Sequence, residues 1–87
     1  MILTDHAKAR WNERFKSFDI EAQFNKSKPA TSAKAIREVL SRSADAARYM
    51  KKRRGLTARI TDDGVLFVCS GKVIITVFKL GYMSVKQ

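Results

Sequence analysis

The chain has 87 residues, of which 45% are hydrophobic, so its length suits one small domain and leaves no room for a second. Its 18 Lys and Arg residues against 8 Asp and Glu residues give a net charge of +10, which favours a polyanionic partner, RNA or DNA. A single cysteine excludes an internal disulfide, and no apolar stretch approaches membrane-spanning length, so we expect a cytoplasmic protein with no membrane contact.

A first helix is predicted from residue 5 to about residue 15. Thr4 can cap this helix, and Asp5 complements the positive end of its dipole. Four apolar residues recur at helical spacing and predict a stripe that faces the core: Ala7, Trp11, Phe15 and Phe18. Three basic residues one turn apart form the neighbouring stripe: His6, Arg10 and Arg14.

Two further helices are expected before residue 55. Asp19 can cap a short helix over IEAQF, and Pro29 prevents its easy continuation. Thr31 or Ser32 starts a longer helix that runs to Tyr49 or Met50, with apolar residues at helical spacing: Ile36, Leu40, Ala44 and Ala47. The KKRR segment comes next, and Gly55 provides a stop.

After residue 55 the pattern changes to strands. LTARI, VLFVCS and KVIITVFKL are rich in β-branched and aromatic residues, and TDDG and SG separate them as hairpin turns. Cys69 lies in an apolar run and is expected to be a buried thiol, and YMSV is a weaker strand candidate. We therefore predict one α+β domain over 1–87, with two or three helices in 1–54 packed on one face of an antiparallel three- to four-stranded meander in 55–87.

The basic stripe on the first helix carries groups suited to RNA cleavage without metal. Such cleavage needs a base for the 2′-hydroxyl proton and cations for the charge that develops on phosphate. His6 can act as the base, because the helix start disfavours its protonated form, and Arg10 and Arg14 can bind phosphate with the free amides of that start. The alternative without catalysis is that His6 only caps the helix start or covers its surface, and that Arg10 and Arg14 lie on a solvent-exposed face of the helix.

The same residues carry a resemblance. The pattern T-x-H-A-x-x-R-x-x-x-R-F at Thr4–Phe15, with I-I-T-V-F at Ile74–Phe78 after the helices, resembles small bacterial and phage domains similar to the barnase, EndoU, colicin and RelE-like toxin ribonucleases. The resemblance implies helices packed on an antiparallel sheet and RNA cleavage with no metal and no cofactor. It also implies that His6 is general base or acid and that Arg10 and Arg14 are phosphate ligands or structural partners. Thr76 would point a hydroxyl toward the site.

Strand alternation constrains Thr76. Ile74, Thr76 and Phe78 share one face and Ile75 and Val77 the other, so Thr76 lines a groove if the latter pair builds the core. Without the resemblance, Thr76 is an ordinary strand residue. The proton donor stays open, because the chain has one histidine, and Tyr49 and Tyr82 are candidates beside lysine, arginine and water.

The densest cationic segment comprises Lys51, Lys52, Arg53 and Arg54. It can clamp a phosphate backbone, or it can be a solvated helix end. Phe67 and Phe78 are expected in the core because the alternating pattern of an RNA-stacking sheet is missing, and Asp62 and Asp63 in TDDG are expected to be turn residues and not metal ligands.

The expected function is a metal-independent, toxin-like endoribonuclease that cleaves by transesterification. One alternative is a protein that binds RNA or DNA through the same basic face without catalysis. Another is a phage-type effector that binds an acidic host protein. Charge complementarity also favours an acidic protein partner such as an antitoxin.

Overall fold

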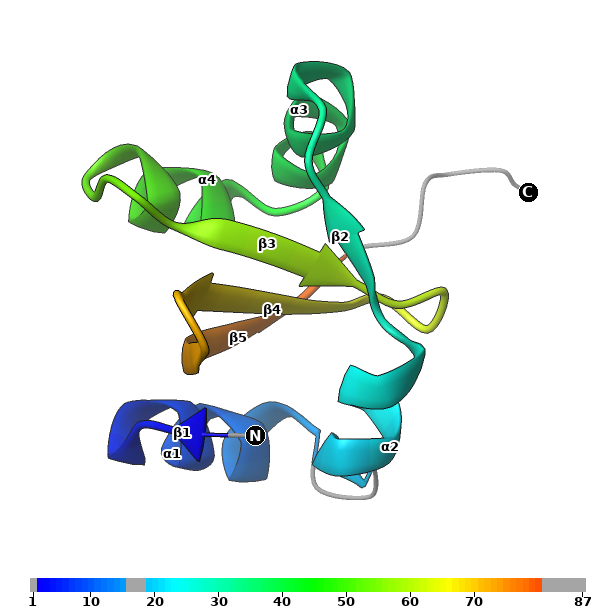
Figure 1. The fold of residues 1–87 in the computed structure, drawn as a ribbon, viewed down its shortest axis with the longest axis vertical. Coiled ribbons are helices and arrows are strands. Elements are labelled where there is room, and N and C mark those ends of the chain that lie inside the picture. Colours follow the sequence, from blue (N-terminus) through cyan, green and yellow to red (C-terminus); the bar gives the residue numbers. More distant parts are fainter. Residues whose placement is uncertain (1, 16–18, 81–87) are drawn as a thin grey trace.

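The computed structural model describes residues 2–15 and 19–80 and is shown in Figure 1. In these ranges it contains four helices and one five-stranded sheet, which occur along the chain as β1 (Ile2–Leu3), α1 (Asp5–Arg14), α2 (Ile20–Lys26), β2 (Lys28–Ala30), α3 (Ala33–Ser41), α4 (Ala44–Lys51), β3 (Thr57–Ile60), β4 (Val65–Ser70) and β5 (Val73–Lys79). The α+β class is therefore confirmed. None of the helices in the described ranges is long and apolar enough to cross a membrane.

Each helix begins where a short polar side chain accepts a backbone N–H. Thr4 caps α1, Asp19 caps α2 and Ser32 caps α3, as the sequence predicts. The prediction of one long third helix is wrong, because α3 ends at Ser41 and Ser43 starts α4 by accepting the Ala46 N–H at 3.1 Å. A serine hydroxyl that takes an amide three residues ahead competes with the helix that would continue through it.

The sheet has the strand order β1-β5-β4-β3-β2. The antiparallel meander β3-β4-β5 is confirmed, and two strands that the sequence did not predict extend it. β1 pairs in parallel with the start of β5, and β2 pairs antiparallel with β3, where Pro29 is tolerated because the strand is at the edge. The sheet is therefore mixed, and region 1–54 is not purely helical. The candidate strand at YMSV lies outside the described residues.

The helices cover both faces of the sheet, so the prediction of a single covered face is wrong (Figure 1). Val65, Phe67 and Cys69 of β4 pack with α1, whereas Leu66 and Val68 pack with α3 and α4. A strand buried on both faces reads as a continuous apolar run, and VLFVC is such a run. β2 carries the chain from the α2 side to the α3 side.

Trp11 fixes α1 to its face of the sheet. Its ring stacks on Phe67 with centroids 5.9 Å apart and lies 4.7 Å from the ring of Phe15. Both Phe67 and Phe78 are buried, as predicted, and so is Cys69. Ala7, Trp11 and Phe15 form the predicted core stripe, while Phe18 lies outside the described residues.

β5 contains an irregularity that the alternation argument missed. Val68 pairs with Thr76 but Cys69 pairs with Ile74, so Ile75 is an extra residue in β5. Ile74 packs on the α1 face, and Ile75 packs with Phe78 on the α3–α4 face. The prediction is therefore right for Thr76, Val77 and Phe78 and wrong for Ile74 and Ile75. Thr76 shares its face with its partner Val68, the face that α4 covers.

Candidate active site

α1 and its cap Thr4 lie beside β5 and are bonded to it at three carbonyls. In the described residues β1 pairs only with Val73 and Ile74, so β1 does not extend along the later part of this edge of β5. The Thr4 N–H donates to the Ile74 carbonyl at 3.1 Å, and its hydroxyl donates to the Ile75 carbonyl at 3.2 Å. Arg14 donates to the Val77 carbonyl at 2.7 Å. These bonds set the position of α1 along the strand.

A pocket of about 340 Å³ opens between α1, α4 and β5. We call it the cationic pocket, and its lining consists of His6, Arg10, Arg14, Asp45, Arg48, Tyr49, Lys52, Arg53, Thr76 and Phe78. All four residues predicted for catalysis are among them. Of the four KKRR residues, Lys52 and Arg53 line the pocket, and Lys51 and Arg54 do not.

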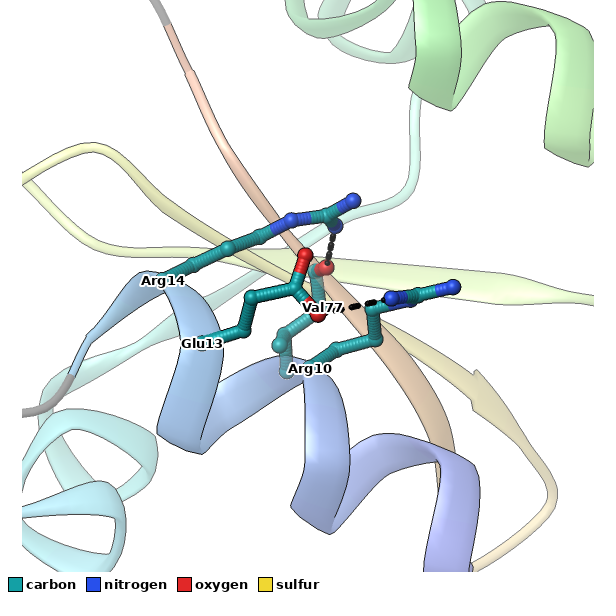
Figure 2. A network of polar contacts seen from close by, with 4 residues as sticks. All are labelled: Arg10, Glu13, Arg14 and Val77. Atoms are coloured by element: carbon teal, nitrogen blue, oxygen red, sulfur yellow. Dashed lines mark hydrogen bonds and ion pairs between the residues drawn. The ribbon is translucent and has the colours of Figure 1, made fainter.

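The α1 wall contributes the predicted basic row. His6 is the second residue of the helix and is exposed. Arg10 pairs with Glu13 at 2.8 Å on the surface, while Arg14 reaches over β5 to the Val77 carbonyl, as Figure 2 shows. The Arg14 guanidinium also lies 5.2 Å from the centre of the Phe78 ring. Arg14 is thus a structural partner of β5, one of the two roles that the resemblance implies for it.

The amides at the start of α1 are only partly open to a ligand. The Ala7 N–H already donates to the Thr4 hydroxyl at 3.1 Å. The predicted phosphate site at this helix start therefore lacks that donor, and the guanidiniums must supply more of the binding.

The α4 wall combines three groups named from the sequence, Tyr49, Lys52 and Arg53, with two that were not assigned to the site, Asp45 and Arg48. Arg48 pairs with Asp45 at 2.5 Å on the helix surface. Arg53 lies with its guanidinium carbon 3.8 Å from the Tyr49 ring centre and donates to the Tyr49 carbonyl at 3.2 Å. The sequence contained one signal for this wall. Lys52 and Arg53 follow Arg48 and Tyr49 by four residues, a spacing that places side chains on the same side of a helix.

Two residues of β5 form the floor of the pocket. Thr76 is 1% exposed and Phe78 is 7% exposed, so the floor is part of the core. The Tyr49 ring meets the Phe78 ring edge-on at a centroid distance of 5.7 Å. Thr76 lines the cationic pocket, but Ile75 packs on the opposite face from Val77, so the condition on which the groove was predicted is not met. The catalytic role of Thr76 stays a prediction.

The charge of the lining favours an anion. Five Lys and Arg residues face one carboxylate, Asp45, which Arg48 already pairs. A phosphodiester that enters would meet guanidinium groups from two helices, and guanidinium matches the geometry of phosphate oxygens. The chain's excess positive charge is thus partly gathered at one concave position.

Other polar groups lie away from this pocket. Asp63 lies in the turn between β3 and β4, as predicted, and hydrogen bonds from Lys26 and then Gln23 of α2 hold the pKa of its carboxyl below the ordinary value. Burial raises the pKa of the Cys69 thiol, against a smaller opposing effect of Arg59. In the described ranges, no three His, Cys, Asp or Glu side chains are grouped so that they could hold a metal ion.

A second pocket of about 480 Å³ lies near β2 and β3. Arg59 and Lys72 are the charged residues of its otherwise largely apolar lining, and none of the predicted site residues belongs to it. The predicted residues therefore gather in the smaller, more strongly charged pocket.

The described residues define an α+β domain with a cationic pocket at one edge of its sheet. No protein-family model, no curated protein and no solved structure matches this chain. The resemblance to toxin ribonucleases stays a prediction that rests on its motif residues.

Proposed function

We propose that this protein is a metal-independent endoribonuclease that cleaves RNA by transesterification in the cationic pocket. One observation carries the proposal. His6, Arg10 and Arg14 near the start of the chain and Thr76 near its end line one pocket, although about 60 to 70 residues separate them in sequence. Their grouping brings a base and two cations to the same place, beside a hydroxyl, and the reaction uses a base for the 2′-hydroxyl proton and cations for the charge on phosphate.

In the proposed reaction the His6 imidazole accepts the proton of a ribose 2′-hydroxyl. The 2′-oxygen attacks the adjacent phosphorus, the bond to the 5′-oxygen breaks, and a 2′,3′-cyclic phosphate remains. Arg10 and Arg14 stabilise the charge on the non-bridging oxygens. Arg14 can do so while bonded to Val77, because a guanidinium has five N–H donors and the bond to Val77 uses one nitrogen.

The size and charge of the pocket favour single-stranded RNA. A volume of about 340 Å³ admits a nucleotide and its phosphate but not a double helix. Lys52 and Arg53 at the end of α4 extend the positive surface and supply phosphate contacts for the flanking strand. The proposal is therefore cleavage within an unpaired segment.

The test compares purified wild type with His6→Ala on mixed RNA in EDTA, with 2′,3′-cyclic phosphate ends as the readout. We expect wild-type cleavage and a loss of about 100-fold or more in the variant. Asn12→Ala is the matched control, because Asn12 is also exposed on α1 but does not line the cationic pocket. It should cleave like wild type.

Three results would overturn the proposal. Equal cleavage by wild type and His6→Ala would show that His6 is not the general base. Salt-sensitive RNA binding without cleavage by wild type would make the protein a binding module. The absence of both RNA binding and cleavage would favour the effector that binds an acidic protein.

A further inference from the structure

We infer that Tyr49 is the general acid that protonates the leaving 5′-oxygen. This inference rests on the proposed ribonuclease function and adds a catalytic residue to it. The observation behind it is that Tyr49, on α4, lines the same pocket as His6, on α1, while the two helices pack on opposite faces of the sheet.

The reaction requires two proton-transfer groups on opposite sides of the phosphorus, because the attacking and leaving oxygens are roughly in line. Trp11 fixes α1 on one face of the sheet, with Phe67. Ala46 fixes α4 on the other face, with Val68. Residues of both helices nevertheless line the cationic pocket, together with Thr76 and Phe78 of β5. His6 belongs to the α1 wall and Tyr49 to the α4 wall.

Tyr49 is also the lining residue whose chemistry best suits a proton donor. The guanidiniums of the pocket stay protonated and do not give up a proton in ordinary catalysis. The hydroxyl of Thr76 is a far weaker acid than a phenol. Lys52 is an exposed residue just beyond the last turn of α4, with a flexible stem, whereas the Tyr49 ring is held by Phe78 on one side and by Arg53 on another. A fixed ring orients its donor better than a flexible chain does.

The proposed step transfers two protons and exchanges one bond at phosphorus. His6 takes the 2′-hydroxyl proton, the bond between the 2′-oxygen and phosphorus forms, and the bond between phosphorus and the 5′-oxygen breaks. The 5′-oxygen receives the Tyr49 proton and leaves as a hydroxyl. The resulting phenolate lies beside the Arg53 guanidinium, 3.8 Å from the ring centre, which stabilises its charge. Proton exchange with water then restores neutral His6 and protonated Tyr49. Arg53 itself transfers no proton and is a positioning and stabilising residue.

The experiment uses two oligonucleotides that differ in one atom. One has the ordinary 5′-oxygen at a single scissile ribonucleotide, and the other has a bridging 5′-sulfur, which leaves without needing a proton. The test variant is Tyr49→Phe, which retains the ring contacts with Phe78 and Arg53 and loses only the hydroxyl. Tyr82→Phe is the comparison variant, because Tyr82 is the other tyrosine in the chain and the competing candidate for the proton donor.

We expect Tyr49→Phe to cleave the oxygen substrate about 100-fold or more slowly than wild type and the sulfur substrate at a wild-type rate. Tyr82→Phe should match wild type on both. His6→Ala should be slow on both, because the attacking hydroxyl still needs its base.

Several results would overturn the inference while the proposed function stands. They are an unchanged rate for Tyr49→Phe on the oxygen substrate, an equal loss on both substrates, or the sulfur-rescued pattern in Tyr82→Phe. Failure of wild type to cleave either substrate would instead refute the proposed function, and this inference with it.

Discussion

Replacing Arg14 by alanine should destabilise the fold, whereas replacing Arg10 should not. Arg14 donates to the Val77 carbonyl at 2.7 Å and lies 5.2 Å from the Phe78 ring centre. A hydrogen bond from a charged group contributes about 1.5–3 kcal/mol and a cation–π contact about 0.5–1 kcal/mol. Water in the pocket can rehydrate the freed carbonyl, so the loss should be near the lower end, about 2 kcal/mol.

The contact that Arg10 makes is weaker. Its partner Glu13 is three residues away on the same helix, and both side chains are exposed, at 36% and 57%. Such a surface pair contributes about 0.3–0.5 kcal/mol. For a domain of this size, about 4–8 °C of Tm corresponds to 1 kcal/mol. Arg14→Ala should therefore lower Tm by about 8–16 °C, and Arg10→Ala by about 1–4 °C.

The assay is thermal unfolding monitored by circular dichroism, at low and at high salt. Salt screens the exposed Arg10–Glu13 pair, so the small Arg10 effect should disappear at about 1 M salt. The Arg14 effect should persist, because its partner is a neutral carbonyl in a partly buried position. Equal Tm values for the two variants at low salt would refute the assignment of a stabilising role to the Arg14 bond between α1 and β5.

Two other predictions concern the KKRR segment and Cys69. Replacing Lys52 and Arg53 together by alanine should weaken the salt dependence of binding to single-stranded RNA. The slope of the logarithm of the binding constant against the logarithm of salt concentration should fall in magnitude by about 0.7 per lost phosphate contact. Replacing the matched pair Lys51 and Arg54, which does not line the pocket, should change this slope less. Equal slopes for the two double variants would contradict this. Burial raises the pKa of the Cys69 thiol above its ordinary value of 9.0, so the unfolded chain loses this proton first as pH rises. The stability that Cys69 adds over Cys69→Ala should therefore be full below about pH 9 and shrink above it in urea unfolding, and a constant difference between the two proteins would contradict this.

The local signals of the sequence predict the helix starts well and the tertiary arrangement poorly. Thr4, Asp19 and Ser32 are caps that act through amides two or three residues away, so the sequence alone contains the whole interaction. Ser43 has the same signal, but the apolar spacing across it favoured a single helix. The VLFVC run could have predicted helices on both faces, because alternation is missing from it.

The two sides of the cationic pocket also differ in how far the sequence predicts them. His6, Arg10 and Arg14 form a row that helical geometry fixes, so the α1 wall could be predicted from spacing. The α4 wall could not, because its place beside β5 depends on α4 covering the opposite face of the sheet. Lys52 and Arg53 follow Arg48 and Tyr49 at i,i+4 spacing, but only the packing of α4 shows that these residues, and not Lys51 and Arg54, line the pocket.

The extra residue in β5 links the fold to the site. Successive carbonyls of a regular strand point to opposite sides, yet the neighbouring carbonyls of Ile74 and Ile75 both accept bonds from Thr4. The irregularity opposite Val68 and Cys69 accounts for this, because it reorients one peptide of the strand. Thr4 also caps α1, so the same residue fixes where the helix begins and where it meets β5. The position of His6 over the pocket therefore depends on an irregular strand at the other end of the chain.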